Sequence, residues 1–174
     1  PGRKGVTILS KLVGQGVDVA VLTNSLAATD VAAVHGAYAN YRKRLLGAGV
    51  KLFELQPFSR ETRISVFGSK GASLHTKAFT VDGRVGFVGS FNFDPRSVSL
   101  NSEMGVLFED ERLVADLSER FASEKSPETS YTVSLRKDGL RWDGAADGHT
   151  ATFTRDPEAS LYRRLIAGLV RWLP

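Results

Sequence analysis

The chain has no cysteine among its 174 residues. This absence excludes disulfide bonds, thiol catalysis and metal sites built on thiolates. Histidine is scarce as well: only His35, His75 and His149 occur, so a metal centre with several histidine ligands is not expected. No apolar run reaches the ~18 residues that a membrane-spanning helix requires. The chemistry to look for is therefore that of carboxylate, ammonium, hydroxyl and single imidazole groups.

The composition is that of an ordinary soluble domain. Apolar residues make up 42% and charged residues 24% of the sequence, near the average for globular domains. The formal net charge of +4 fits either plain solubility or an anionic partner. We therefore predict one domain over residues 1–174, with enough length for a hydrophobic core. Because the chain begins at Pro1, without methionine, and ends after a helical pattern, we expect it to be part of a longer protein.

Helical and strand patterns alternate in the first third of the chain. Apolar residues at helical spacing predict a helix over 4–14, and the β-branched run at 17–22 predicts a buried strand. A long helix is predicted over 30–47, with a basic cluster that starts at Arg42 near its C-terminal end, and a strand follows over 50–55. This order is typical of an α/β layer with parallel strand pairing.

The rest of the chain is predicted to contain a hairpin and further strands and helices. Alternation predicts a strand over 74–81, the Asp82-Gly83 pair is a strong hairpin signal, and a return strand follows over 84–89. The other predicted elements are a strand at 104–109, a helix at 110–124, a small β excursion at 126–150 and an amphipathic helix at 157–173.

The hairpin gathers side chains that suit a phosphodiester. Residues two apart on a strand point to the same face, so His75 and Lys77 project together. The return strand delivers Ser90 and Asn92 in the same way. Lysine supplies a point charge to the non-bridging oxygens, the carboxamide adds a donor, and histidine can be a nucleophile or proton donor near neutral pH. Glu103 starts the next strand, where a carboxylate could hold the imidazole in one tautomer.

Structural interpretations compete with these assignments. A lone histidine on a strand is more often structural than catalytic, and an Asp-Gly pair is usually only a turn. Asp82 has the opposite parity from Lys77, so we expect it to face elsewhere. His35 is expected to be structural or exposed, and His149 is expected to be exposed. The complete spacing of the hairpin set favours the functional interpretation, because a chance match at six positions is improbable.

These residues resemble the signature of the phospholipase D superfamily, which reads histidine, any residue, lysine, four residues, aspartate, six residues, then Gly-Ser-x-Asn. The sequence matches it without a gap at His75, Lys77, Asp82, Gly89, Ser90 and Asn92. Residues 93–97 and 100–103 also resemble the lipid-transferring branch, in particular the C-terminal half of bacterial cardiolipin synthases of the C type. Similarity to that half extends to residues 22–26, 29–31 and 156–174.

The resemblance implies the α/β fold class, as an α/β/α sandwich with a mixed central β-sheet flanked by helices. It also implies a metal-independent reaction without a cofactor, in two steps through a phosphohistidine. Carried over residue by residue, the catalytic set is His75, Lys77, Asp82 and Glu103, and the phosphate-binding set is Lys77, Ser90 and Asn92. In the family Glu103 would orient His75, whereas Asp82 is mostly structural support.

The superfamily pattern implies two motif copies, of which one histidine attacks phosphorus and the other protonates the leaving alcohol. This chain carries one copy. If it is the second half of a two-motif enzyme, which we prefer, the resemblance makes His75 the general acid. If two copies of the chain pair instead, their His75 side chains share one site. The expected partner is therefore a complementary half-domain, from the same chain or from a dimer mate, and the isolated chain is expected to be inactive.

Three functions follow from these patterns. The leading one is phosphatidyl transfer that forms cardiolipin from phospholipids at a membrane surface, with a location peripheral to the bacterial inner membrane or in the cytoplasm. The apolar helix at 157–173 could contribute at an anionic interface, although core packing is the commoner role. The second is a phosphodiesterase or nuclease that acts as a single-motif homodimer; nucleic acid ranks lower as a partner because no aromatic and basic stacking platform is evident. The third is a non-enzymatic half-domain.

Overall fold

The structure is a computed structural model of the whole chain, and it describes residues 2–29, 32–57, 77–91, 102–146 and 149–170. The elements are α1 (Arg3–Gly14), β1 (Ala20–Asn24), α2 (Ala32–Ala39), α3 (Arg42–Gly47), β2 (Lys51–Leu55), β3 (Lys77–Val81), β4 (Val85–Gly89), β5 (Gly105–Phe108), α5 (Glu111–Glu124), β6 (Ser130–Arg136), β7 (Gly139–Ala146), β8 (His149–Phe153) and α6 (Leu161–Val170). The predicted mixed α/β class is confirmed. Across the described ranges, no helix combines the length and the apolar character needed to cross a bilayer.

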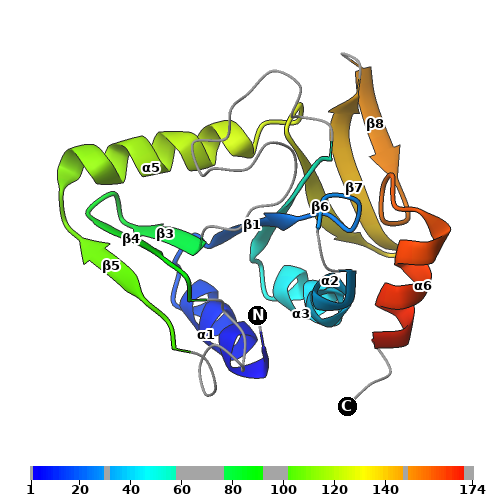
Figure 1. Cartoon of the computed structure of the whole chain (residues 1–174), viewed down its shortest axis with the longest axis horizontal. Coiled ribbons are helices and arrows are strands. Elements are labelled where there is room, and N and C mark those ends of the chain that lie inside the picture. The colour runs from blue at the N-terminus through cyan, green and yellow to red at the C-terminus, as the bar shows by residue number, and fades with distance from the viewer. Residues whose placement is uncertain (1, 30–31, 58–76, 92–101, 147–148, 171–174) are drawn as a thin grey trace.

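The larger sheet has five strands in the order β1-β2-β6-β7-β8. β1 and β2 run parallel, with Ala20 opposite Lys51 and Asn24 opposite Leu55. The other pairs are antiparallel, so the sheet is mixed. In the view of Figure 1, α1, α2 and α3 lie below β1, and α5 lies above it. The parallel pairing predicted from the alternation of helices and strands is confirmed.

The core of this sheet is built from apolar side chains at the predicted periods. Val6 of α1 and Leu45 of α3 are buried against Leu52 of β2. Tyr131 and Val133, two residues apart on β6, point into the same cluster. Helical spacing on α1 and alternation on the strands therefore each provide one buried face.

The long helix predicted over 30–47 is interrupted. α2 ends at Ala39, and the Tyr41 N–H donates to the Tyr38 carbonyl at 2.8 Å across a turn before α3 begins at Arg42. The prediction that Arg42 lies near the C-terminal end of a long helix is therefore wrong. It is the first residue of α3, and it is buried. The interruption turns its side chain toward the interior of the protein.

The region 126–150, predicted to be a small excursion, is instead part of the main sheet. It supplies β6 and β7, and β6 pairs directly with β2, with Val133 opposite Leu52. The two inward side chains of β6 explain the difference, because their burial requires the strand to lie within the sheet.

β3, β4 and β5 form a second sheet, which is antiparallel and three-stranded. α5 packs on one face of it, as Figure 1 shows. Asp110 caps α5, since its Oδ1 accepts a hydrogen bond from the Leu113 N–H at 2.9 Å. Within the described residues the strands thus divide between two sheets rather than one central sheet, and the motif hairpin lies in the smaller one.

Candidate active site

The hairpin that carries the motif turns where the sequence predicts. Asp82 and Gly83 have φ of 51° and 65°, the left-handed values that the mirror-image turns of β-hairpins require. The Arg84 N–H donates to the Val81 carbonyl at 3.0 Å and closes the turn. Aspartate tolerates this backbone conformation and glycine adopts it freely. The turn therefore sets the register of β3 against β4.

That register places Lys77 in a row with two glycines. Lys77 pairs with Gly89 of β4, and Gly89 pairs with Gly105 of β5. The ring of Phe87 lies over both glycines, because a Cβ on Gly89 would come within 2.8 Å of it and a Cβ on Gly105 would come closer still. A larger residue at either position would displace the ring beside Lys77.

Ser90 is held between its neighbouring strand ends. Its Oγ donates to Oε2 of Glu103 at 2.6 Å and accepts from the Met104 N–H at 3.1 Å. Its own backbone N–H donates to the Met104 carbonyl at 2.8 Å. Ser90 directly follows Gly89, the strand partner of Lys77. A hydroxyl, a carboxylate and an ammonium group are thus brought to the same end of the hairpin.

The remaining motif residues divide into two groups. Asp82 is exposed at the turn, at the other end of β3 from Lys77, which is a separation of about 16 Å in an extended strand. Its predicted contribution to the site is therefore through the turn rather than by contact with Lys77 or Ser90. His75 and Asn92 lie outside the described residues, so their roles stay predictions.

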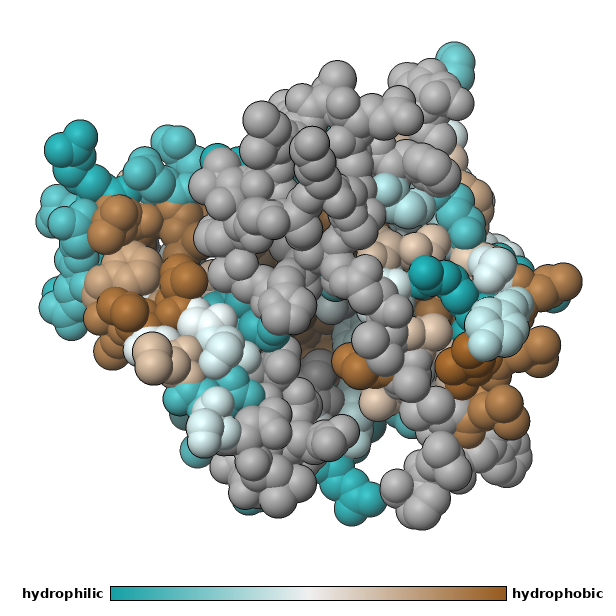
Figure 2. Space-filling view, viewed as in Figure 1, coloured by the Kyte–Doolittle hydropathy of each residue, from teal (hydrophilic) through white to brown (hydrophobic). Residues whose placement is uncertain are grey.

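The face of the small sheet that carries Lys77 is otherwise apolar and exposed. Phe79 and Val81 alternate with Lys77 along β3, Phe87 pairs with Phe79, and Leu107 pairs with Phe87. Phe79, Val81 and Leu107 are 50%, 47% and 65% exposed. The Phe79 and Phe87 rings stack at 5.0 Å. We call these four apolar residues the hairpin face; Figure 2 shows apolar atoms gathered at this end of the molecule.

A shallow groove lies on the opposite face of the same sheet. It is lined by Val88 and Phe108 of the strands and by side chains of α5 such as Leu117. Val88 alternates with Phe87, so it points away from the face of Lys77. The groove is therefore not part of the motif site.

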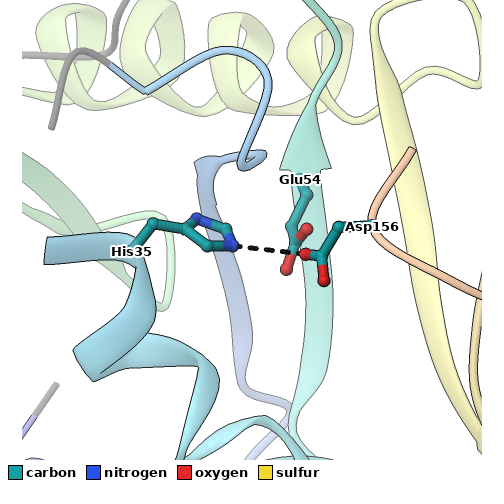
Figure 3. Close-up of side chains that lie close together, drawn as sticks. All are labelled: His35, Glu54 and Asp156. Carbon is teal, nitrogen blue, oxygen red and sulfur yellow. Dashed lines mark ion pairs between the residues drawn. The ribbon is translucent and has the colours of Figure 1, made fainter. Parts of the chain in front are cut away.

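A second cluster of polar side chains is buried against the five-stranded sheet. Nε of Arg42 donates to Oε1 of Glu54 at 2.7 Å, and Nη2 donates to Oε2 of Glu54 at 3.0 Å. Nη2 also donates to Oδ1 of Asp156 at 2.8 Å. Nε2 of His35 lies 3.4 Å from the same Asp156 oxygen, as Figure 3 shows. Side chains from α2, α3, β2 and the segment before α6 thus form one network.

Both carboxylate oxygens of Glu54 accept hydrogen bonds from neighbouring side chains. The Tyr38 hydroxyl donates to its Oε1 at 3.1 Å, and Nε1 of Trp142 donates to its Oε2 at 2.9 Å. Glu54 and Arg42 are 0% and 1% exposed, so the ion pair is shielded from solvent on both sides. Burial, together with the Glu54 charge, raises the pKa of the Tyr38 hydroxyl well above its ordinary value.

The electrostatics of the cluster are those of a closed ion pair. Burial alone would raise the pKa of Asp156, but its hydrogen bonds to His35 and Arg42 and their charges hold it well below its ordinary value. His35, Glu54 and Asp156 have ligand atoms close enough together for a metal ion. The Arg42 guanidinium already lies between both carboxylates. The cluster therefore suits a structural network better than a metal centre.

The sequence anticipated this network only in part. His35 was predicted to be structural or exposed, and it is buried and hydrogen-bonded, which confirms the structural alternative. His149 is exposed, as predicted. Glu54 was not singled out, and Arg42 was placed only near the end of a long helix. The available signal was Glu54 itself, a charged residue between apolar neighbours on a strand predicted to be buried.

Comparison with known proteins places these features in a family. The chain matches the family model described as "Cardiolipin synthase, PLD-like domain" over residues 1–125. It is 40% identical to cardiolipin synthase C of Escherichia coli strain K12 over 179 aligned residues, which include all of this chain and 38% of that protein. It is 30% identical to an uncharacterized protein of Helicobacter pylori strain J99, covering all of this chain and 34% of that protein.

A further relative matches over a shorter part of the chain. The chain is 34% identical to cardiolipin synthase A of Proteus mirabilis over 110 residues, which are 63% of this chain and 19% of that protein. No solved structure matches. The chain spans well under half the length of each of these relatives. Because the family model covers most of the chain, the protein belongs to the family of cardiolipin synthase, phospholipase D-like domains.

Proposed function

We propose that this chain is the second half of a two-motif enzyme of the phospholipase D type, which transfers phosphatidyl groups and forms cardiolipin at a membrane surface. One observation carries the proposal: the sequence motif is unbroken, and its described part lies on a hairpin that brings Lys77, Ser90 and Glu103 to one end, in a chain of the cardiolipin synthase family. The proposed location is peripheral to the bacterial inner membrane.

The reaction proceeds in two steps, formation and breakdown of a phosphohistidine. A histidine nitrogen of the first half attacks phosphorus, so that a P–N bond forms while the P–O bond to the leaving alcohol breaks. His75, as general acid, gives its proton to the leaving oxygen. An alcohol of a second lipid then attacks phosphorus, the P–O bond forms as the P–N bond breaks, and His75 takes the proton of that alcohol. If water attacks instead, the result is hydrolysis.

The other motif residues position and stabilise the phosphate. The Lys77 ammonium and the Asn92 carboxamide bind non-bridging oxygens, where negative charge increases in the transition state. Glu103 orients His75, and Ser90 supports this arrangement because its hydroxyl already donates to Glu103 at 2.6 Å. Asp82 contributes by maintaining the turn that sets the register of the hairpin.

The proposed partner is the first half of the same longer chain, and the hairpin face is the surface that it covers. This face is half-exposed and apolar, which is unusual for a surface that remains in water. It also carries Lys77, so a domain seated on it would exclude water from the motif. The E. coli relative has ample length for such a domain, since this chain corresponds to 38% of it.

The test is genetic and chemical. The longer gene that contains this chain is expressed in a bacterium that lacks its own cardiolipin synthases, and lipids are separated by thin-layer chromatography. We expect cardiolipin from the unaltered gene and none from His75→Ala. If the unaltered protein is abundant and folded but makes no cardiolipin, the proposal is wrong.

A phosphodiesterase or nuclease is the second candidate, favoured by the net charge of +4. In that case two copies of this chain would pair and share one site. The prediction is cleavage of DNA without added metal, at a rate that falls steeply with salt concentration and rises with dimer formation. Intact DNA at protein concentrations where a dimer is present would remove this alternative.

A further inference from the structure

Helix α6 presents its leucines to solvent. Leu161, Leu165 and Leu169 recur at intervals of four residues and are 78%, 67% and 70% exposed. Tyr162, beside the first of them, is 72% exposed. Residues four apart lie on one side of a helix, so these leucines form a single continuous stripe. We call Leu161, Tyr162, Leu165 and Leu169 the α6 stripe.

The basic residues of the same helix point the other way. Nη1 of Arg163 donates to the carbonyls of Leu26, at 3.1 Å, and Thr29. Nη2 of Arg164 donates to the Asp156 carbonyl at 2.9 Å. A surface helix normally turns its apolar side inward and its charges outward. α6 is arranged in the reverse sense, with its arginines bound to backbone carbonyls of the protein.

The packing of α6 keeps this orientation in place. Ala167 lies against Gly36 of α2 so closely that a Cβ on Gly36 would come within 2.7 Å of the Ala167 carbonyl. The helix therefore cannot rotate to bury its leucines without breaking both this contact and the arginine hydrogen bonds. Exposure of the stripe is thus a consequence of the fold, and Figure 2 shows the apolar atoms over α6.

We propose that the α6 stripe docks into the interface of a phospholipid bilayer. The stripe carries no charge, and its aliphatic side chains suit the acyl boundary, whereas an exposed tyrosine suits the headgroup level. The formal net charge of +4 carried by the chain complements anionic headgroups.

The position of the stripe separates it from the surface assigned to the partner half-domain. In Figure 1, α6 and the small sheet lie at opposite ends of the long axis. A lipid surface as occupant also rests on the proposed function, because phospholipid substrates lie in a bilayer. The alternative occupants, a second copy of this chain or another part of the longer protein, become outcomes of the test.

The test uses the absence of cysteine from the sequence. Leu165→Cys and, as a matched control on α5, Leu113→Cys are each labelled with an environment-sensitive nitrobenzoxadiazole fluorophore. Leu113 is 54% exposed, so both positions start in water. Vesicles of phosphatidylglycerol and phosphatidylethanolamine are then added to the labelled chain. We expect a blue shift and an intensity rise for the label at 165 and no change at 113.

A second measurement keeps the result interpretable. The double variant Leu165→Gln/Leu169→Gln is expected to lower vesicle co-sedimentation at least tenfold while leaving circular dichroism and the monomeric mass unchanged. Unchanged co-sedimentation would overturn the proposal, and so would a stripe label that responds to protein concentration rather than to vesicles. Neither the fluorescence of the label nor co-sedimentation requires turnover. Cardiolipin formation by the longer enzyme is measured separately. Vesicle binding without cardiolipin formation refutes only the proposed function, and an unchanged rate of cardiolipin formation in the double variant refutes only the α6 proposal.

Discussion

The two sheets of this protein treat polar and apolar side chains in opposite ways. The five-stranded sheet encloses charged residues, and Arg42 and Glu54 are fully buried and bonded to each other. The three-stranded sheet exposes apolar residues, among them Phe79 and Leu107, on the face that carries Lys77. In the first sheet, the buried charges of Arg42 and Glu54 neutralise each other. The second has a face that only another surface can complete.

This difference separates the residues that stabilise the fold from those that carry function. Substitutions in the buried network are expected to change the free energy of unfolding, whereas substitutions around Lys77 are expected to change turnover. Variants in each sheet can therefore sharpen that separation or break it.

The largest effect is expected for Arg42→Met. The variant leaves the buried carboxylate of Glu54 without its cation, and loss of one member of a buried pair costs about 3–5 kcal/mol. Urea unfolding at pH 7 measures the loss. The control is Lys51→Met, which breaks an exposed pair with Asp18 and should cost no more than about 1 kcal/mol. Equal losses in the two variants would mean that the network does not hold the larger sheet together.

Lys77→Ala in the longer enzyme is expected to lower the rate of phosphatidyl transfer by ~10²–10³ while leaving the unfolding curve unchanged. The reason is the loss of the positive charge that is proposed to bind the non-bridging oxygens. A radiolabelled lipid transfer assay gives the rate. Lys51→Ala serves as the control, because it removes an exposed lysine of the larger sheet that is paired with Asp18. A variant at position 77 that retains its rate would exclude Lys77 from the phosphate site.

Asp156→Asn is expected to destabilise the chain by about 1–3 kcal/mol near neutral pH, since a charged hydrogen-bond acceptor is lost. The folded-state pKa of Asp156 lies below its unfolded value of ~3.9, so its contribution is fully present above about pH 5 and is lost as the pH falls through the folded pKa. The stability difference between the two proteins should therefore shrink on acidification below about pH 4. Urea titrations at several pH values test this, and a difference that grows toward low pH would reverse the assigned sign.

The smallest effect is expected for Leu107→Gln. Leu107 is 65% exposed, so the unfolding free energy of this chain alone should change by no more than about 0.5 kcal/mol. In the longer enzyme, where the first half is proposed to cover the hairpin face, the same change should cost about 1–2 kcal/mol, a large part of the value of burying a leucine. Leu113→Gln on α5 is the matched control. Identical losses in both contexts would mean that the hairpin face stays uncovered.

The sequence predicted those parts of the fold that depend on local signals. The Asp82-Gly83 turn and the parallel pair β1-β2 follow from turn chemistry and from periodicity, and both are observed. The interruption before Arg42 could not be predicted in this way, because it results from contacts with Glu54 and Asp156, residues distant in the chain. Tertiary contacts of this kind override helix propensity.

The candidate site shows the same limit. Lys77 and Ser90 were singled out from motif spacing, and the structure places them at one end of the hairpin. The bond between Ser90 and Glu103 was not expected, because it depends on how β5 aligns with β4. Glu103 was expected to hold His75. His75 lies outside the described residues, so this role of Glu103 stays a prediction.

The most direct test compares two histidines. His75→Asn and His35→Asn are introduced separately into the longer enzyme, and both the transfer rate and the urea midpoint are measured. We predict that His75→Asn lowers the rate by ~10²–10⁴ with an unchanged midpoint. His35→Asn, which weakens the network of Arg42 and Asp156, is predicted to lower the midpoint and to retain most of the rate of the folded protein. The reverse pattern, with turnover dependent on His35 and stability on His75, would contradict the catalytic role proposed for His75 and the structural role assigned to His35.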